Sequence, residues 1–235
     1  NSAIWSGTRI IAPAAAGIII AVFNPAFAFF AASFGFALMA YFIYSLKPIP
    51  SVATTRVSPA KEMLEGFNFI RRNSPFPFLI VMTFFNSFFG ISYIYLMPVF
   101  AIDILKIGTI GQGWLLSISG VGSLVTTVWL GTAKTINNKS VLVIGGGIGF
   151  GLSIAAFGLT SRFLPSYGIA LLLMLVIGLT SSTYMISIQS SLQLLVPDNM
   201  RGRVMGFFGM SWNILPIGGM QVGTLASFIT APYAV

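Results

Sequence analysis

The sequence predicts an all-α polytopic membrane protein, and three observations support that prediction. Charged residues make up 7% of the 235 positions, whereas 56% are apolar. A typical soluble domain has about 25% charged residues, so this chain lacks the polar surface that a water-soluble fold needs. Long apolar runs are separated by Pro, Gly and charged residues, and the run 169–179 is apolar on every face. Such runs favour helices over the alternating strands of a β-barrel.

Seven segments are long enough to cross a bilayer as helices, because a span needs roughly 20 predominantly apolar residues. Turn signals separate them, such as Asn24-Pro25, since proline moves the preceding residue out of helical geometry. The predicted helices cover, in chain order and approximately, residues 3–23, 26–46, 77–104, 112–133, 141–160, 167–195 and 204–230.

One connection is much longer than the others, and it divides the chain into 1–46, the linker 47–76 and 77–235. Within the linker, Ser58 and Pro59 are typical of a helix start. The apolar face of that helix would carry Met63, Leu64, Phe67 and Ile70. We expect this amphipathic helix to lie in the membrane interface, the alternative being a solvated linker.

The basic residues divide unequally between the two sides that alternating spans define. Ten of the twelve fall on one side, namely Arg9, Lys47, Arg56, Lys61, Arg71, Arg72, Lys134, Lys139, Arg201 and Arg203. Lys106 and Arg162 fall on the other. Short loops rich in Lys and Arg stay in the cytoplasm, so the start of the chain and residues 47–76, 134–140 and 196–203 are expected there. The net charge of +8 thus reflects topology, and nucleic-acid binding is not expected.

Several kinds of chemistry are not expected. The chain has no Cys and no His, which removes the usual ligands of a metal site and the usual acid–base group at neutral pH. No cluster of activated nucleophiles or carboxylates indicates an enzyme, and no cofactor is expected. The glycine-rich run 145–151 lies inside an apolar span, so it predicts a helix-packing surface and not a phosphate loop. The first residue is Asn1, from which we expect a piece of a longer protein.

Two motifs on the basic side carry a family resemblance. Residues 65–72 read Glu-Gly-Phe-Asn-Phe-Ile-Arg-Arg and resemble an E-G-x-x-F-x-x-R segment. Residues 196–206 resemble a V-P-x-x-x-R-G-R-V-M segment. Both are similar to motifs of the major facilitator superfamily, in its siderophore- and drug-exporter branch of enterobactin-exporter-like permeases. The resemblance implies two six-helix halves joined by a cytoplasmic loop, with this chain covering about helices five to eleven and lacking the N-terminal helices.

That resemblance implies a secondary active transporter in the plasma (inner) membrane. It would export a small amphipathic molecule, a drug or a siderophore, by alternating access and proton antiport. The spans hold no suitable proton-carrying carboxylate, so the coupling residue would lie in the missing N-terminal helices. Two alternatives stay open, a permease subunit of a larger transport complex and a non-transporting seven-helix receptor.

The expected functional residues fall into three groups. Polar and aromatic residues within the spans would line the substrate cavity, namely Asn86, Tyr93, Tyr184, Trp212 and Asn213, with interhelical hydrogen bonding as the alternative role. The cytoplasmic gating motif would comprise Asp198, Arg201, Gly202 and Arg203, in which Asp198 caps the next helix and the arginines anchor the loop or pair with Asp198 or lipid phosphate. Pro13 and Gly17 match an antiporter helix-packing motif in part.

Overall fold

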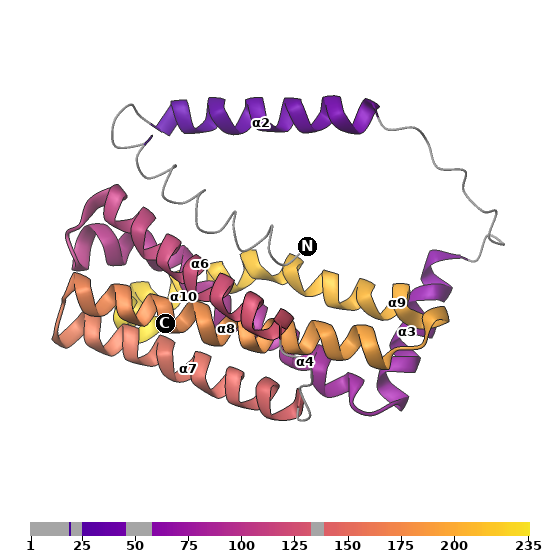
Figure 1. The fold of residues 1–235 in the computed structure, drawn as a ribbon. Coiled ribbons are helices and arrows are strands. Elements are labelled where there is room, and N and C mark those ends of the chain that lie inside the picture. Colours follow the sequence, from indigo (N-terminus) through magenta and orange to yellow (C-terminus); the bar gives the residue numbers. More distant parts are fainter. Residues whose placement is uncertain (1–18, 20–24, 46–57, 133–138) are drawn as a thin grey trace.

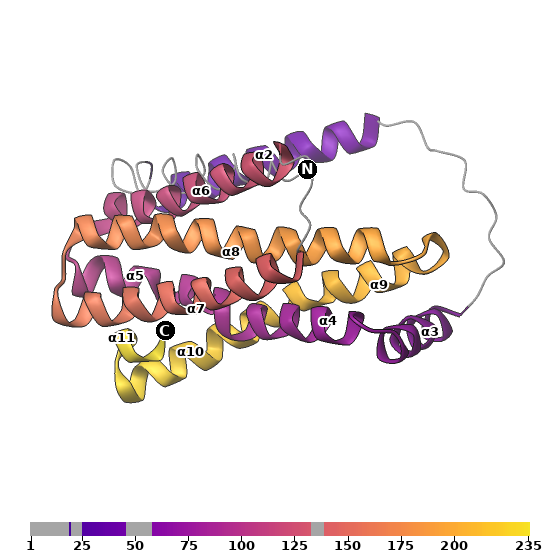
Figure 2. The same cartoon turned by 60° about the horizontal axis from the view of Figure 1, so that its bottom comes forward.

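The computed structural model describes residues 25–45, 58–132 and 139–235, together with Ile19. Every regular element within these ranges is helical (Figure 1). The long helices run along a common direction (Figures 1 and 2). The predicted all-α fold class is therefore confirmed.

Four helices in the described ranges are long and apolar enough to cross a membrane: Phe76–Ile104, Gly108–Thr132, Ser140–Phe163 and Tyr167–Leu195. The last of these has the predicted bounds, because Pro165 and Val196-Pro197 interrupt the helix on either side. The predicted start at 112 is wrong, since α6 (Gly108–Thr132) begins four residues earlier. The prediction 141–160 was also too short, since α7 covers Lys139–Phe163.

The first of these spans is not a uniform α-helix. Its parts are α4 (Phe76–Phe85), the π-turn η1 (Asn86–Gly90), the 3₁₀ segment η2 (Ile91–Leu96), α5 (Met97–Val99) and the second π-turn η3 (Phe100–Ile104). Wider and tighter turns rotate the side chains that follow them relative to an ideal helix. The faces that residues present along this span therefore differ from a simple 3.6-residue periodicity.

Helix α8 (Tyr167–Leu195) packs along both α6 and α7 and lies between them (Figure 2). Glycines bring the α6 and α8 backbones into contact, because a Cβ on Gly178 would overlap the carbonyl oxygen of Ser119. The Ser182 hydroxyl also donates to Ser123 Oγ at 2.6 Å across this interface. Small residues at this crossing permit the close approach that membrane helices use in place of a hydrophobic driving force.

The glycine-rich run of α7 packs against α8, as the sequence predicts. A Cβ on Gly146 would lie 2.9 Å from the backbone nitrogen of Tyr184, and one on Gly149 would lie 3.0 Å from the Thr180 side chain. Gly145 and Gly151 have no neighbour within 4 Å at the Cβ position. The packing surface thus comprises part of the run.

The final predicted span, 204–230, starts too late, but its predicted end lies within one residue of the end of α10. Helix α9 (Asp198–Met210) begins six residues earlier, and it continues through η4 (Ser211–Ile214) into α10 (Leu215–Ile229). Thr230 has a φ of 73°, which ends the helix, and α11 (Ala231–Ala234) follows. This helical run is not among the four membrane-span candidates of the described ranges.

The two remaining helices lie before the first span. Helix α2 (Pro25–Ser45) occupies most of the predicted segment 26–46, and its described side chains are exposed. Helix α3 (Pro59–Arg72) has Pro59 in its first turn, as expected, but Ser58 makes no side-chain cap bond. The predicted segment 3–23 lies outside the described residues, except for Ile19.

The described basic side chains separate toward the two ends of the bundle. Lys61, Arg71, Arg72, Arg201 and Arg203 belong to α3 and the start of α9, which meet at one end (Figure 1). The other two lie at the opposite end of the bundle, where Lys106 comes just after η3 and Arg162 lies in the last turn of α7. Of the other predicted basic positions, Arg9, Lys47, Arg56 and Lys134, and the Lys139 side chain, lie outside the described residues.

Candidate substrate cavity and the contact between the two motifs

A cavity of about 420 Å³ lies among the spans. Its wall combines residues of α4, η1, α7, α8, α10 and α11. Aromatic rings form much of it, with Asn86, Tyr184 and Gln221 as polar members; the lining comprises Met82, Phe85, Asn86, Phe89, Gly90, Gly147, Phe150, Gly151, Ile154, Ala155, Tyr184, Gln221, Val222, Leu225, Ala234 and Val235. The volume is within the range of small-molecule sites, roughly 300–1,000 Å³.

The cavity lies near the middle of the membrane-spanning helices. Gly90 is the central residue of the span Phe76–Ile104, and Gly151 is the central residue of α7. Both glycines line the cavity. A ligand held there would sit far from both membrane surfaces.

Asn86 and Tyr184 are the two predicted substrate-binding residues that line the cavity. Asn86 is 4% exposed, and its side-chain nitrogen lies 3.3 Å from Met185 Sδ. A thioether is a weak acceptor, so this contact leaves most of the amide's hydrogen-bonding capacity for another partner. The Tyr184 hydroxyl donates to the Met82 carbonyl at 2.7 Å, which fixes the ring across the wall between α8 and α4.

The other three predicted cavity residues do not line this cavity. Tyr93 is buried in the hydrophobic core, with its ring edge-on to Phe150 at a centroid distance of 6.5 Å. Trp212 and Asn213 lie on η4 and are exposed. Changes in helix phase explain this outcome, because the π-turn η1 precedes Tyr93 and Tyr93 itself lies in the 3₁₀ segment η2. The 3₁₀ turn η4 likewise rotates Trp212 and Asn213, which it contains.

Gln221 and the aromatic wall were not predicted from the sequence. Gln221 lies on α10, five residues after Pro216, and a polar side chain deep in an apolar segment is the signal that could have identified it. Phe150 lies within the glycine-rich run 145–151, whose sequence indicates helix packing alone, and so its place in the cavity wall was not predicted. No side-chain hydrogen bond of Gln221 to another described residue is found.

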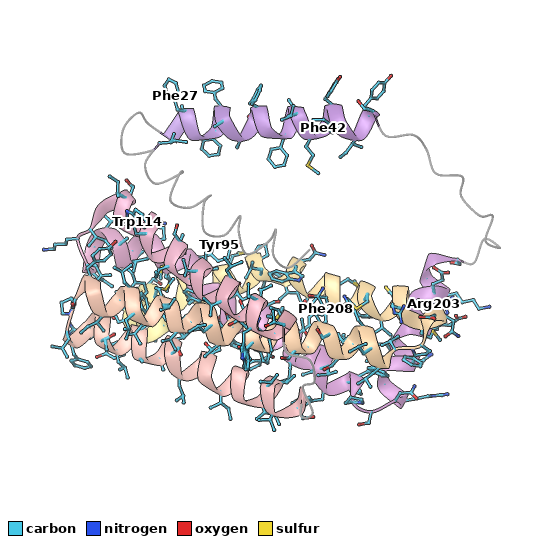
Figure 3. The ribbon with its side chains drawn as sticks, in the orientation of Figure 1. Phe27, Phe42, Tyr95, Trp114, Arg203 and Phe208 are labelled. Atoms are coloured by element: carbon cyan, nitrogen blue, oxygen red, sulfur yellow. The ribbon has the colours of Figure 1, made fainter. Side chains whose placement is uncertain are left out.

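The two motifs, residues 65–72 and 196–206, contact each other although they are far apart in the sequence. Arg203 on α9 binds Glu65 on α3, with Nη1 and Oε2 2.7 Å apart, and its other terminal nitrogen lies 3.5 Å from Glu62 Oε1. Gly66 allows this approach, because a Cβ there would lie 3.0 Å from the Arg203 Cβ and 3.2 Å from the Phe207 ring. Figure 3 shows Arg203 at the end of the bundle, beside α3.

Two charged residues at the start of α9, Asp198 and Arg201, form a local ion pair. Arg201 Nη2 lies 2.7 Å from Asp198 Oδ1, one of the pairings that the sequence allows. The predicted side-chain cap by Asp198 is wrong, since the position before the helix is Pro197 and no capping hydrogen bond forms there. Arg201, Gly202 and Arg203 therefore lie within a helix and not in a loop. Pro13 and Gly17 lie outside the described residues.

Within the described ranges, no group of three or more Asp, Glu, Cys or His side chains is placed to hold a metal ion. The described acidic residues number four, and three of them take part in the ion pairs of α3 and α9. The cavity wall includes no acidic residue. Its chemistry is that of hydrogen bonding and aromatic contact.

A comparison with known protein families identifies the family of this chain. The sequence model of the Major Facilitator Superfamily matches residues 1–220. The chain belongs to the major facilitator superfamily. A comparison with curated proteins found no match. As a member of this superfamily the protein is a multi-pass membrane protein and a secondary transporter of small molecules, and proteins of this superfamily are generally not enzymes.

Proposed function

We propose that this major facilitator superfamily protein exports a small amphipathic molecule, a drug or a siderophore, by alternating access coupled to proton antiport. The cavity near the middle of the spans is the observation that carries the proposal. Its aromatic side chains suit the apolar body of such a molecule, and Asn86 and Gln221 offer hydrogen bonds to a polar group. A site at this depth is where an alternating-access transporter holds its cargo.

The proposed topology places the protein in the plasma (inner) membrane with α3 and the start of α9 in the cytoplasm. The cluster of basic residues at that end of the bundle supports this orientation. The proposed domain organisation follows, with 1–46 ending one half, 47–76 as linker and 77–235 belonging to the other half.

We further propose that the chain covers about helices five to eleven of a twelve-helix permease. The family match over residues 1–220 and the contact between the two motifs support this proposal. The complete reading frame tests it. Four further spans upstream would support it, whereas a start codon immediately before Asn1 would contradict it.

Export is tested with the complete protein in an efflux-deficient bacterial strain. We expect ethidium retention to fall on expression and to recover when a proton uncoupler is added. Cells that express the Asn86→Leu variant should retain as much ethidium as cells without the protein, because the substitution removes a polar group from the cavity. Asn213→Leu is the matched control, since it makes the same exchange at an exposed position outside the cavity.

Membrane levels of each variant are measured alongside, by quantitative immunoblotting and size-exclusion profile. Unchanged dye retention and unchanged drug susceptibility on expression would contradict drug export. Secretion of a catecholate siderophore by a strain that lacks its own exporter then tests the second cargo class. Failure in both assays would overturn the exporter proposal.

A further inference from the structure

Helix α3 lies at the end of the bundle where α8 ends and α9 begins, and it crosses the direction of the long helices (Figures 1 and 2). It packs against α9 and meets the start of α4. The ends of the membrane-spanning helices mark the level of the lipid headgroups. Helix α3 therefore lies at headgroup depth, beside the body of the protein.

One side of α3 is held by the protein. Gly66 and Ile70 are buried against the bundle, and the Phe67 and Phe207 rings are 6.3 Å apart. Glu62 and Glu65 extend toward Arg203 on the same side. This attachment fixes the rotation of the helix and so determines which residues face outward.

The outward side carries Met63 and Leu64, with Phe67 at its edge, and the described bundle leaves about half of each of these large apolar side chains exposed. Met63, Leu64 and Phe67 are 54%, 58% and 49% exposed, respectively. Leaving three such side chains in water is unfavourable. Amphipathic helices that lie in the membrane interface bury residues of this kind at the boundary between headgroups and acyl chains.

Cations without ion-pair partners among the described residues accompany this apolar side. Lys61, Arg71 and Arg72 are exposed and take part in none of the ion pairs found there. Glu62 and Glu65 pair with Arg203 instead. Lys61 and Arg72 are eleven residues apart, so they lie on the same stripe of the helix.

We propose that the outward side of α3 is a docking surface for anionic phospholipid headgroups. Met63, Leu64 and Phe67 enter the boundary region, and Lys61, Arg71 and Arg72 bind lipid phosphates. Charge complementarity selects this partner, because both acidic residues of α3, Glu62 and Glu65, already pair with Arg203 and leave the three cations of the helix without an anionic partner among the described residues. Each Lys or Arg near an anionic membrane surface strengthens membrane binding about fivefold. Three such cations should therefore make anionic lipid a clearly better partner of α3 than zwitterionic lipid.

The 235 residues contain no cysteine, so once any cysteine outside them is replaced by serine, a single introduced thiol can carry a probe. The complete protein with Leu64→Cys, labelled with bimane, is reconstituted in phosphatidylcholine vesicles that contain phosphatidylglycerol. One of the two lipids is brominated in each sample, at equal mole fraction, and quenching of the probe reports which lipid lies beside α3. Leu164→Cys is the matched reporter, because Leu164 is exposed beside Arg162 at the opposite end of the bundle.

We expect brominated phosphatidylglycerol to quench the probe at position 64 at least about twice as strongly as brominated phosphatidylcholine does, given three cations. The probe at position 164 should show little preference. Replacing Lys61, Arg71 and Arg72 by Gln should make quenching by the two lipids equal at position 64, whereas Arg162→Gln should leave it unchanged. Equal quenching in the parent protein would overturn the proposal, and so would no quenching by either lipid, which would show that protein or water covers this side.

Discussion

Replacing Gly178 by Ala should separate α6 from α8 and destabilise the bundle. The added methyl group would overlap the carbonyl oxygen of Ser119, a backbone atom that cannot rotate away. The contact is reciprocal one turn further along α6, where a Cβ on Gly122 would overlap the carbonyl oxygen of Leu175. Relief therefore requires the two helix axes to move apart along this crossing.

The size of the effect follows from three contributions. Alanine favours the helix over glycine by about 1 kcal/mol. Overpacking of a closely packed interface costs about 1–3 kcal/mol. Separation also weakens the bonds from Ser182 to Ser123 at 2.6 Å and from Thr126 to the Leu179 carbonyl at 3.0 Å, each contributing about 0.6 kcal/mol in a membrane protein. With overpacking at the upper end of its range, the free energy of unfolding should fall by about 2–3 kcal/mol.

The assay is unfolding of the purified protein in mixed micelles, followed by circular dichroism as sodium dodecyl sulfate is increased. The matched control is Gly145→Ala, because that glycine has no neighbour within 4 Å at its Cβ position. The control should leave stability unchanged or raise it by about 1 kcal/mol. If Gly178→Ala proved as stable as Gly145→Ala, the close packing of α6 on α8 would be refuted.

Three further predictions concern contacts away from that crossing. In a double-mutant cycle, Arg203→Gln and Glu65→Gln should show a coupling of about 0.5–1 kcal/mol in the same unfolding assay, since both side chains are partly exposed, and additive effects would argue against the ion pair. Tyr184→Phe should lower stability by about 0.5–1.5 kcal/mol by removing the hydrogen bond to the Met82 carbonyl, and a silent change would mean that the bond contributes nothing. Gly66→Ala should displace α3 from α9, which hydrogen exchange of α3 would detect as faster exchange; unchanged exchange would show that the contact tolerates a methyl group.

The fold class could be predicted from the sequence because lipid-facing helices require long uncharged runs bounded by strong interruptions. The segment 167–195 shows this most clearly, since proline lies just outside both of its ends. The start of α9 could not be predicted in the same way. Asp198, Arg201 and Arg203 indicate a loop by their charge, yet they lie in a helix that extends beyond the apolar segment.

The candidate site could be predicted only in part, and the reason is helix phase. Asn86 is the first residue of the irregular part of its span and lines the cavity, whereas Tyr93 lies inside that part, in η2, and is buried in the core. The contact between Arg203 and Glu65 depends on tertiary packing between α9 and α3, which no local periodicity contains. Those two motifs could be recognised individually, but their pairing could not.

The irregular span Phe76–Ile104 differs mechanically from the three helices beside it. Helices α6, α7 and α8 are continuous, and close contacts at glycines join α8 to both α6 and α7. These three helices therefore form one rigid unit, in which no helix can slide independently of the others. The neighbouring span changes its winding at Asn86, Ile91 and Phe100, and each change is a place where a small adjustment of torsion angles bends the rod. The span Phe76–Ile104, which supplies one wall of the cavity, is therefore the helix that bends most easily. A bend at Asn86 would change the shape of that wall, whereas the cavity residues on α7 and α8 would keep their positions.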